Sequence, residues 1–246
     1  MGRRRLDVAL VERGLFDSRA KARAAIEAGR VTVGGVAALK PAEPVDDDAV
    51  LAAEPAHPWV GRGALKLAHA LQLWPIALQG AVVLDVGAST GGFTEVCLAA
   101  GAVRVYAVDV GRGQLHASLA ADPRVVSLEA TDARTLSAAL VPEPVDLIVS
   151  DVSFIGLAKV LPAALALARP GADLVTLVKP QFEVGPAKVG KGGVVRDEAA
   201  RAEAVEGVRA FLEASGWSVL AVADSPITGA DGNREYLLHA RRRGGA

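Results

Sequence analysis

Short apolar runs alternate with longer amphipathic stretches from residue 81 to residue 240. Short apolar runs between turn residues are typical of buried strands, and apolar residues spaced three and four apart are typical of helices. The pattern predicts helices between most of the strands, including one over 197–215, and strands over 81–86, 103–108, 124–128, 145–150, 173–178, 217–223 and 235–240. Such alternation produces a mostly parallel sheet with right-handed crossovers. No helix separates the last two strands, so we expect a seven-stranded α/β sheet whose final strand is antiparallel.

The first 55 residues follow a different pattern. Apolar positions predict one helix over 5–14, and Ser18 is a good N-cap for a second helix over 19–28. Valines on both sides of Gly34-Gly35 predict a tight hairpin. We therefore expect three segments along the chain: a small α+β domain over 1–55, a linker over 56–62, and the α/β domain over 63–246, which opens with an amphipathic helix at about 64–73.

Composition and charge narrow the class of protein. The net charge is −1, but residues 1–40 carry nine Lys or Arg against four Asp or Glu, a local excess that favours phosphate binding. The single cysteine, Cys97, lies in an apolar segment, so we expect a buried structural thiol and, with four scattered His, no metal site. No apolar leader follows the basic N-terminus, and no run reaches the length of a membrane-spanning helix. We expect a cytoplasmic protein that does not act at a membrane.

The first strand of the α/β domain runs into a glycine-rich turn at residues 87–92. Such a turn lets a ligand approach the backbone beside a helix N-terminus. The dinucleotide fingerprint needs Gly where Ser89 stands, which disfavours NAD. The turn resembles the S-adenosylmethionine (SAM) loop of Rossmann-like methyltransferases. The resemblance implies SAM as the cofactor and assigns it contacts from Asp85, Gly87, Ala88, Ser89, Thr90, Gly91, Gly92 and Phe93.

Two further acidic residues stand at strand ends. Asp109 follows the second strand of the domain, where its carboxylate can accept hydrogen bonds from both ribose hydroxyls of an adenosine. Asp132 follows the third strand, where it could accept from the adenine amino group or act as a helix N-cap near Thr135. We include both residues in the predicted cofactor site.

Four charged residues converge on the same sheet edge by topology alone. Asp151 and Lys179 each follow a parallel strand, Glu235 begins the antiparallel final strand, and Lys66 lies on the helix before the first strand. Each residue taken separately could be an ordinary salt bridge at a strand end. Together, Lys66, Asp151, Lys179 and Glu235 resemble the catalytic tetrad of RNA 2′-O-ribose methyltransferases. That resemblance makes Lys179 the base, or the group that polarises the hydroxyl, and makes the carboxylates orienting groups.

The N-terminal domain resembles the S4 RNA-binding module, whose basic second helix and hairpin face folded RNA. The alternative is an unrelated helical appendage. A basic, glycine-rich loop over 185–193 and a tail of three arginines at 241–243 are further candidates for phosphate contacts. The loop could instead be a solvated connection, and the tail a disordered end. The predicted RNA-binding residues are Arg3, Arg4, Arg19, Lys21, Arg23, Arg30, Arg62, Lys188 and Lys191.

Several motifs together resemble one family over essentially the whole chain. These are residues 59–67, 109–115, 150–155, 178–183 and 232–236, and they resemble the TlyA family of S4-fused methyltransferases. The resemblance implies transfer of a methyl group from SAM to a cytidine 2′-hydroxyl of ribosomal RNA within ribosomal subunits. Arg112 stands where Tyr is expected in much of the family. Two alternatives remain, a catalytically silent RNA-binding assembly factor and, from the family's haemolysin label, a membrane-active toxin.

Overall fold

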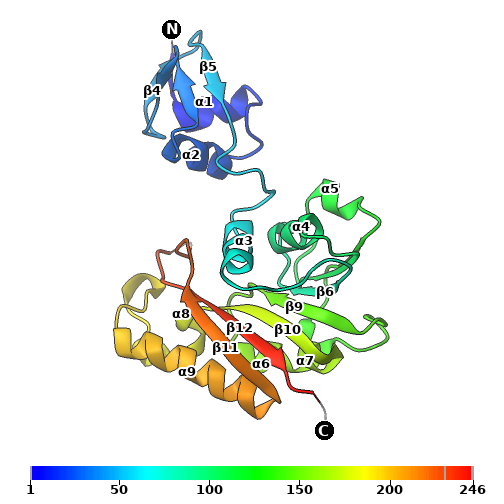
Figure 1. Cartoon of the computed structure of the whole chain (residues 1–246). Helices are drawn as coiled ribbons and strands as arrows, with labels where there is room; N and C mark the ends of the chain where they lie inside the picture. Colours follow the sequence, from blue (N-terminus) through cyan, green and yellow to red (C-terminus); the bar gives the residue numbers. More distant parts are fainter. Residues whose placement is uncertain (1, 230, 245–246) are drawn as a thin grey trace. The chain divides into compact units, whose positions relative to one another are not determined.

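The computed structural model describes residues 2–229 and 231–244. The chain divides into two compact units, Met1–Pro58 and Trp59–Ala246, called unit 1 and unit 2 below (Figure 1). Unit 2 matches the predicted Rossmann-like α/β class. Within the described residues, no helix combines the length and apolar character needed to cross a membrane.

Unit 1 packs two helices against short strands. Its elements are β1 (Arg3–Arg5), α1 (Leu6–Glu12), α2 (Arg19–Glu27), β2 (Val31–Val33), β3 (Val36–Ala37), β4 (Pro44–Asp46) and β5 (Leu51–Ala53). Strand β2 pairs with β3 and β5, and β1 pairs with β4. The core contains Leu6, Leu10, Ile26 and Val31, all fully buried. Periodicity had placed these apolar residues on helices and a hairpin correctly.

For unit 1, the predicted helix cap is confirmed, whereas the predicted bounds of the first helix are wrong. Ser18 caps α2 as predicted, because its hydroxyl accepts a hydrogen bond from the Lys21 amide. The helix predicted over 5–14 is shorter at both ends, and Arg5 belongs to strand β1 instead. A three-arginine strand has no apolar alternation, so only its pairing with the distant β4 defines it.

Unit 2 contains one seven-stranded sheet in the order β11-β12-β10-β9-β6-β7-β8. Its strands are β6 (Val82–Val86), β7 (Arg104–Val108), β8 (Val125–Leu128), β9 (Val145–Ser150), β10 (Ala168–Val178), β11 (Trp217–Asp224) and β12 (Tyr236–Arg242). Strand β12 runs antiparallel to both neighbours, as predicted from the missing helix before it. Strand β10 begins earlier than predicted, and its register shifts between Ala168 and Asp173.

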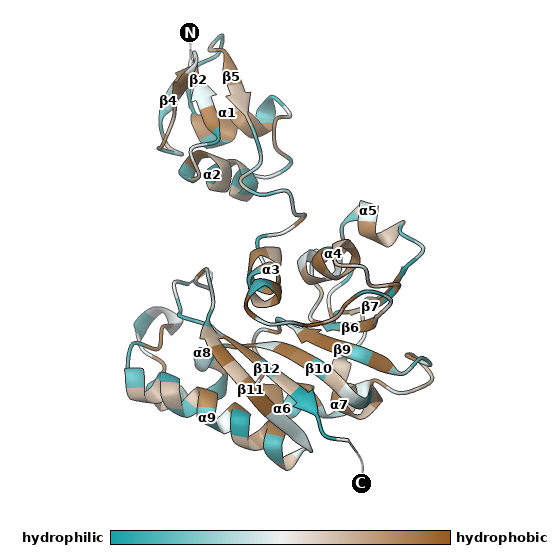
Figure 2. Ribbon diagram, in the orientation of Figure 1, coloured by the Kyte–Doolittle hydropathy of each residue, from teal (hydrophilic) through white to brown (hydrophobic). Residues whose placement is uncertain are grey.

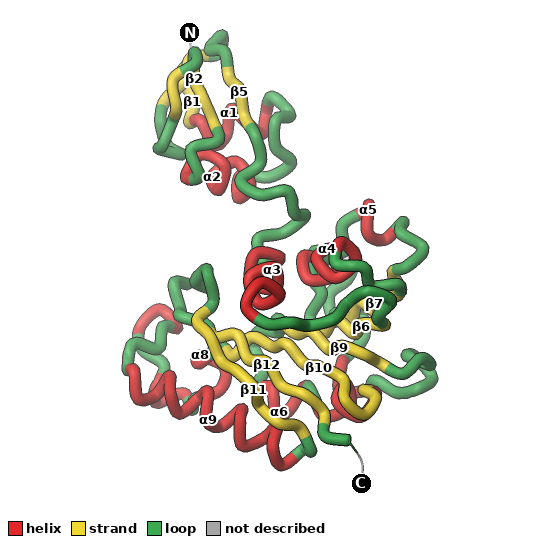
Figure 3. The backbone as a smooth tube through the Cα atoms, viewed as in Figure 1, coloured by secondary structure: helices red, strands yellow, loops and turns green. Residues whose placement is uncertain are grey.

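Helices cover both faces of this sheet (Figures 1 and 3). The helices of unit 2 are α3 (Ala64–Leu73), α4 (Gly92–Ala99), α5 (Ala117–Ala120), α6 (Leu157–Val160), α7 (Pro162–Leu167), α8 (Pro180–Glu183) and α9 (Glu198–Ala214), with 3-10 turns η1 (Ala133–Thr135), η2 (Pro186–Lys188) and η3 (Lys191–Gly193). Helices α3 and α4 pack on one face, and α6, α7 and α9 pack on the other. The connection before β8 contains the four-residue helix α5, and the connection after it contains the 3-10 turn η1.

Alternation along the central strands builds two separate cores. On β6, Val83 packs toward α3 and α4, whereas its neighbour Leu84 packs toward the opposite helices. Figure 2 shows the hydrophobic residues concentrated along these strands and on helix sides that face them. Cys97 is fully buried in the α3–α4 core, as predicted, and burial raises the pKa of its thiol. Each fully buried Leu or Ile contributes roughly 1.5–3 kcal/mol, so the sheet is a rigid base for its loops.

Candidate active site

The site forms where the strand order reverses between β6 and β9. Ligands of open α/β sheets bind at such a point, outside the carboxyl ends of the strands. The backbone amide of Asp151, just past β9, donates to the carbonyl of Val86 at the end of β6. On the other side, Val178 of β10 pairs with Tyr236 of β12, so the next residues along the ladder are Lys179 and Glu235. Antiparallel pairing thus brings two distant predicted residues face to face.

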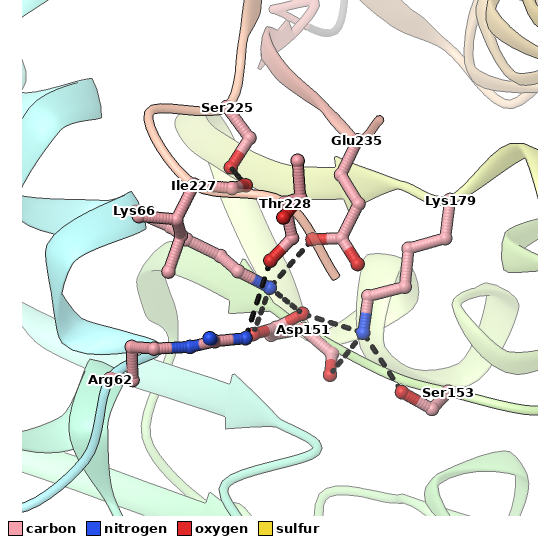
Figure 4. A network of polar contacts seen from close by, with 9 residues as sticks. All are labelled: Arg62, Lys66, Asp151, Ser153, Lys179, Ser225, Ile227, Thr228 and Glu235. Atoms are coloured by element: carbon pink, nitrogen blue, oxygen red, sulfur yellow. Dashed lines mark hydrogen bonds and ion pairs between the residues drawn. The ribbon is translucent and has the colours of Figure 1, made fainter. Parts of the chain in front are cut away.

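The four predicted catalytic residues form one continuous chain of ion pairs (Figure 4). Lys179 Nζ lies 2.8 Å from Asp151 Oδ1, and Lys66 Nζ lies 3.1 Å from Asp151 Oδ2. Lys66 Nζ also lies 2.7 Å from Glu235 Oε2. The charges therefore alternate in the order Lys179, Asp151, Lys66, Glu235. Their side chains are 3–17% exposed, so water screens the pairs weakly.

The two lysines have different surroundings. Lys66 lies between two carboxylates, whereas Lys179 contacts one carboxylate and the hydroxyl of Ser153, 2.8 Å away. A cavity of about 240 Å³ is lined by Lys179, Asp151 and Ser153, together with residues of the glycine-rich turn. Lys66 and Glu235 do not line it. Lys179 therefore lies on the wall of this cavity, and Lys66 lies behind Asp151.

The irregular segment over residues 151–154, referred to below as the 151–154 turn, contributes side chains to this cavity and to a larger one. Phe154 adopts a left-handed backbone conformation (φ 68°), which is unusual for a bulky residue, and its side chain is 91% exposed. A Cβ added to Gly87 would lie 3.2 Å from backbone atoms of Val152, so glycine there lets the two loops approach. Strain of this kind concentrates at functional sites.

The larger cavity, of about 510 Å³, lies at the ends of β6 and β7 and meets the smaller one at Gly87, Ser89, Asp151 and Ser153. Asp109 lines it, and its carboxylate is held in place by the backbone amides of Ser89 (2.8 Å) and Gly111 (2.7 Å). A carboxylate has about four acceptor positions, so two remain for hydroxyl donors. The other lining residues include Val86, Val108, Val110, Val152 and Ile155, an apolar surface suited to a flat ring.

This donor set fits an adenosine-containing cofactor such as SAM. The larger cavity has the size of a typical ligand pocket. It combines an anchored carboxylate that can bind a ribose, an apolar slot, and a turn that carries no side chain at Gly87. Of the ten predicted cofactor residues, all except Asp85 and Gly91 line one of the two cavities. Gly91 instead admits Leu115 and Leu119, which a Cβ there would overlap.

Asp85 is fully buried beneath the turn and accepts a hydrogen bond from the hydroxyl of Thr94 at 2.7 Å. Burial raises the pKa of Asp85 to about 7, while the Thr94 hydrogen bonds oppose the shift. Its Oδ1 has no hydrogen-bond partner within the described residues. This hydrogen bond therefore links the end of β6 to α4 beneath the glycine-rich turn.

Asp132 is the N-cap of η1, the alternative that its sequence position had left open. Its carboxylate pairs with the Arg134 guanidinium at 2.6 Å, and this hydrogen bond, with that from the Arg134 amide, lowers the pKa of Asp132 to about 2. Both residues line the larger cavity. An adenine amino group would meet a carboxylate already paired with arginine, so contact with Asp132 remains a prediction.

Sequence reasoning assigned no role to Ser153 or Asn233. Asn233 is 1% exposed; its side-chain oxygen accepts from the Val195 amide at 3.0 Å and its nitrogen donates to the Gly193 carbonyl at 2.9 Å. These bonds tie the segment before Glu235 to the basic loop after Lys179. A lone asparagine carries no periodicity, although its place two residues before Glu235 was a usable signal.

The predicted RNA-binding residues of unit 1 are on its surface but paired. Each side chain is at least 42% exposed, and the pairs are Arg3–Asp46, Arg4–Glu12, Arg4–Asp47, Arg19–Asp7, Lys21–Asp17, Arg23–Glu27 and Arg30–Glu54. Exposed pairs of this kind are weak, so phosphates can compete for the basic groups.

In unit 2, the predicted RNA contacts have mixed surroundings. Arg62 is exposed and donates to the Thr228 carbonyl at 3.3 Å, beside the four predicted catalytic residues (Figure 4). Lys188 pairs with Glu203, and Lys191 is exposed on η3. All three tail arginines form hydrogen bonds within unit 2, for example Arg241 with Asp173, and phosphate contact by this segment stays a prediction. Within the described residues, no group of three or more His, Cys, Asp or Glu side chains could hold a metal ion.

Fold, cavities and tetrad together define the class, a Rossmann-like methyltransferase with an S4 domain at its N-terminus. Residues 59–242 match the FtsJ-like methyltransferase family, and residues 4–51 match the S4 domain.

The chain belongs to the TlyA family within the FtsJ-like methyltransferases. It is 50% identical to the 16S/23S rRNA (cytidine-2′-O)-methyltransferase TlyA of Mycobacterium tuberculosis, over 97% of this chain and 90% of the relative. It is 38% identical to Hemolysin A of Brachyspira hyodysenteriae, over 96% of this chain and 98% of the relative. A solved structure from Streptococcus thermophilus, provisionally assigned as a hemolysin, is 38% identical, with a TM-score of 0.77 over 99% of this chain and 90% of that one.

Proposed function

We propose that this chain transfers a methyl group from SAM to the 2′-hydroxyl of a cytidine in ribosomal RNA, within ribosomal subunits. The observation that carries the proposal is the ion-paired series Lys179, Asp151, Lys66 and Glu235, which opens on a cavity beside the glycine-rich turn. A hydroxyl acceptor needs such a set, because its proton must be removed as the new bond forms. The rRNA cytidine-2′-O activity named for the Mycobacterium tuberculosis relative supports the choice of acceptor.

SAM would occupy the larger cavity, with its ribose hydroxyls on the Asp109 carboxylate and its adenine near Asp132 and the apolar slot. When bound there, it supplies an electrophilic methyl group on a sulfonium. The residues of the turn, from Gly87 to Phe93, would surround the rest of the molecule. The two cavities share four lining residues, and Lys179 lines the smaller one, which supports a methyl donor within reach of Lys179.

The four residues of the tetrad would have different roles in proton removal. Lys179, in its neutral form, accepts the proton of the ribose hydroxyl. Asp151 fixes the position of the Lys179 nitrogen, and Lys66 and Glu235 hold Asp151 in turn. Positioned bases of this kind contribute roughly 100- to 10,000-fold to rate. Unit 1 would bind the RNA backbone through its exposed basic residues, which position the substrate without reading its sequence.

The test is methyl transfer to purified ribosomal subunits, followed by mapping of ribose methylation by mass spectrometry. We expect label from SAM at a cytidine 2′-oxygen with the wild-type chain. Lys179→Ala should abolish transfer while circular dichroism and thermal unfolding stay near wild type.

The matched control is Lys159→Ala, an exposed lysine on α6 outside both cavities. This variant should retain full activity. Label on a nucleobase, or none on either subunit under any condition, would refute the proposal; the second result would favour the silent assembly factor.

A further inference from the structure

Lys179 Nζ has three acceptors of different chemical character. They are Asp151 Oδ1 at 2.8 Å, Ser153 Oγ at 2.8 Å and the Asp151 backbone carbonyl at 3.4 Å. A carboxylate and a carbonyl can only accept hydrogen bonds, so both favour the charged ammonium. A hydroxyl can accept from the ammonium and, after rotating, donate to the neutral amine. Ser153 is thus the contact that can serve both protonation states.

We propose that Ser153 is a positioning residue that keeps the Lys179 nitrogen in place both before and after it takes up the hydroxyl proton. The proposal rests on the proposed function for the meaning of that proton. It deepens the role of the same site with a residue outside the charged tetrad.

The backbone around Ser153 holds the serine hydroxyl against the Lys179 nitrogen. The close approach of Gly87 to Val152 fixes one end of the turn, and the left-handed conformation of Phe154 fixes the other. The Phe154 ring also packs against Phe182 of α8, with centroids 5.2 Å apart. Because α8 starts directly after Lys179, this aromatic contact ties the serine's turn to the lysine's own segment.

The charges around Lys179 come from every neighbouring element. Asp151 lies at the end of β9, Lys66 on α3, Glu235 before β12, and Arg62 on the segment before α3 (Figure 4). All of them keep their charges when Ser153 is changed. An effect of Ser153 on the protonation of Lys179 therefore reflects the hydroxyl and not a change in net charge.

The proton balance of the step is simple. The acceptor oxygen forms a bond to the methyl carbon as the carbon–sulfur bond breaks, and the sulfur leaves with that electron pair as a neutral thioether. The hydroxyl proton moves to the lone pair of Lys179, giving an ammonium. Ser153 then changes from donor to acceptor, and the proton is later released to water.

The experiment compares three variants. Ser153→Ala removes the hydroxyl, Ser153→Thr keeps one, and Ser127→Ala is a control at an exposed serine on β8. Isotope-labelled lysine allows the Lys179 side-chain resonance, assigned by its loss in Lys179→Ala, to be titrated by NMR in the free protein. In Ser153→Ala the ammonium loses one of its three acceptors, and this charge-assisted bond is stronger than the bond that the neutral amine loses. We therefore expect the titration midpoint to fall by about one unit, and to stay near wild type in the other two variants.

The second readout is the pH profile of methyl transfer with saturating SAM, and SAM affinity is measured in parallel. Ser153→Ala should be about tenfold slower at high pH, where Lys179 is neutral but less well positioned, and should approach wild type as the pH falls. Ser153→Thr should restore the wild-type rate. An unchanged midpoint in Ser153→Ala would overturn the proposal, as would an equal loss of rate at every pH. Because the NMR titration needs no RNA and no turnover, it decides this inference even if the proposed methyl transfer fails.

Discussion

Two charge clusters, one in each unit, show how differently similar ion pairs can be used. In unit 1, Asp7 is fully buried and pairs with Arg5 and Arg19, whose side chains are 50% and 57% exposed. All three lie within 15 residues of sequence. The arginines keep their contact with water, so the cluster ties the strand β1 and helix α2 to α1 at low desolvation cost.

In unit 2, all four charges of the tetrad are largely removed from water and come from segments up to 169 residues apart. Burying ion pairs costs free energy that apolar residues of the same size would not. A stabilising role alone explains the first cluster but not the second. The comparison supports the catalytic role proposed for the tetrad, and it can be tested by breaking each cluster in turn.

The largest effect is expected for Asp151→Asn, which removes the carboxylate shared by Lys66 and Lys179 while keeping its shape. Two buried ammonium groups would then lack their common partner, and Lys179 would lose its fixed position. We expect methyl transfer to fall roughly 100- to 10,000-fold in single-turnover kinetics. Asp122→Asn, which changes a surface pair with Arg124, should have no effect on rate. An active Asp151→Asn would contradict the assignment of the tetrad.

Asp7→Asn should instead affect stability and leave chemistry in unit 2 intact. It weakens charge-assisted hydrogen bonds to two arginines, at a cost of about 1.5–3 kcal/mol in the unfolding of unit 1. Urea unfolding monitored by hydrogen exchange would resolve the two units. SAM binding to unit 2 should be unchanged, and Asp48→Asn, an exposed acid of the same unit, should match wild type.

The lowered pKa of Asp7 predicts that the stability of unit 1 depends on pH. Hydrogen bonds from Arg5, with further help from Arg19, lower the pKa of Asp7 from 3.8 to about 2. A carboxyl whose pKa is lower in the folded state stabilises the fold above its unfolded pKa. That contribution should be lost as the pH falls from about 4 to about 2. Asp7→Asn should unfold with a flatter pH dependence in this range, and an unchanged slope would contradict the pairing.

Asn233→Ala should have an intermediate effect, on the support of the tetrad. The substitution leaves the buried Val195 amide and the Gly193 carbonyl without their side-chain partner, which loosens the segment that carries Glu235. We expect about a tenfold loss of rate with SAM affinity unchanged. Asn233→Asp can still accept from Val195 but cannot donate to Gly193, so its activity should fall between the two. Equal activity in all three proteins would show that the loop is held by other contacts.

The smallest effect is expected for Arg23→Ala in unit 1. Arg23 is 56% exposed and lies 3.8 Å from Glu27, a pair too weak to contribute measurably to stability. We expect RNA affinity to fall about threefold, with a shallower salt dependence and the same unfolding curve. Arg209→Ala on α9 is the matched control and should bind RNA normally. A loss of stability in Arg23→Ala would place this arginine with Asp7 in the structural cluster.

Much of this architecture could be predicted from the sequence. Hydrophobic periodicity located all seven strands of unit 2, because alternation is a local property of buried strands. The missing helix before the last strand predicted its antiparallel direction, and that direction was enough to bring Glu235 beside Lys179. The glycine-rich turn and the tetrad could be recognised because fixed spacings relate them to strand ends.

Only the tertiary structure decided how these groups are connected. Strand β1, for example, is defined only by its pairing with β4. The division of the tetrad, with Lys179 on the cavity and Lys66 between two carboxylates, depends on distances that no spacing encodes. The same holds for Ser153, whose hydroxyl reaches Lys179 through a left-handed turn at Phe154. Periodicity records which side of an element is buried, whereas hydrogen bonds are made between side chains that the fold brings together from distant parts of the chain.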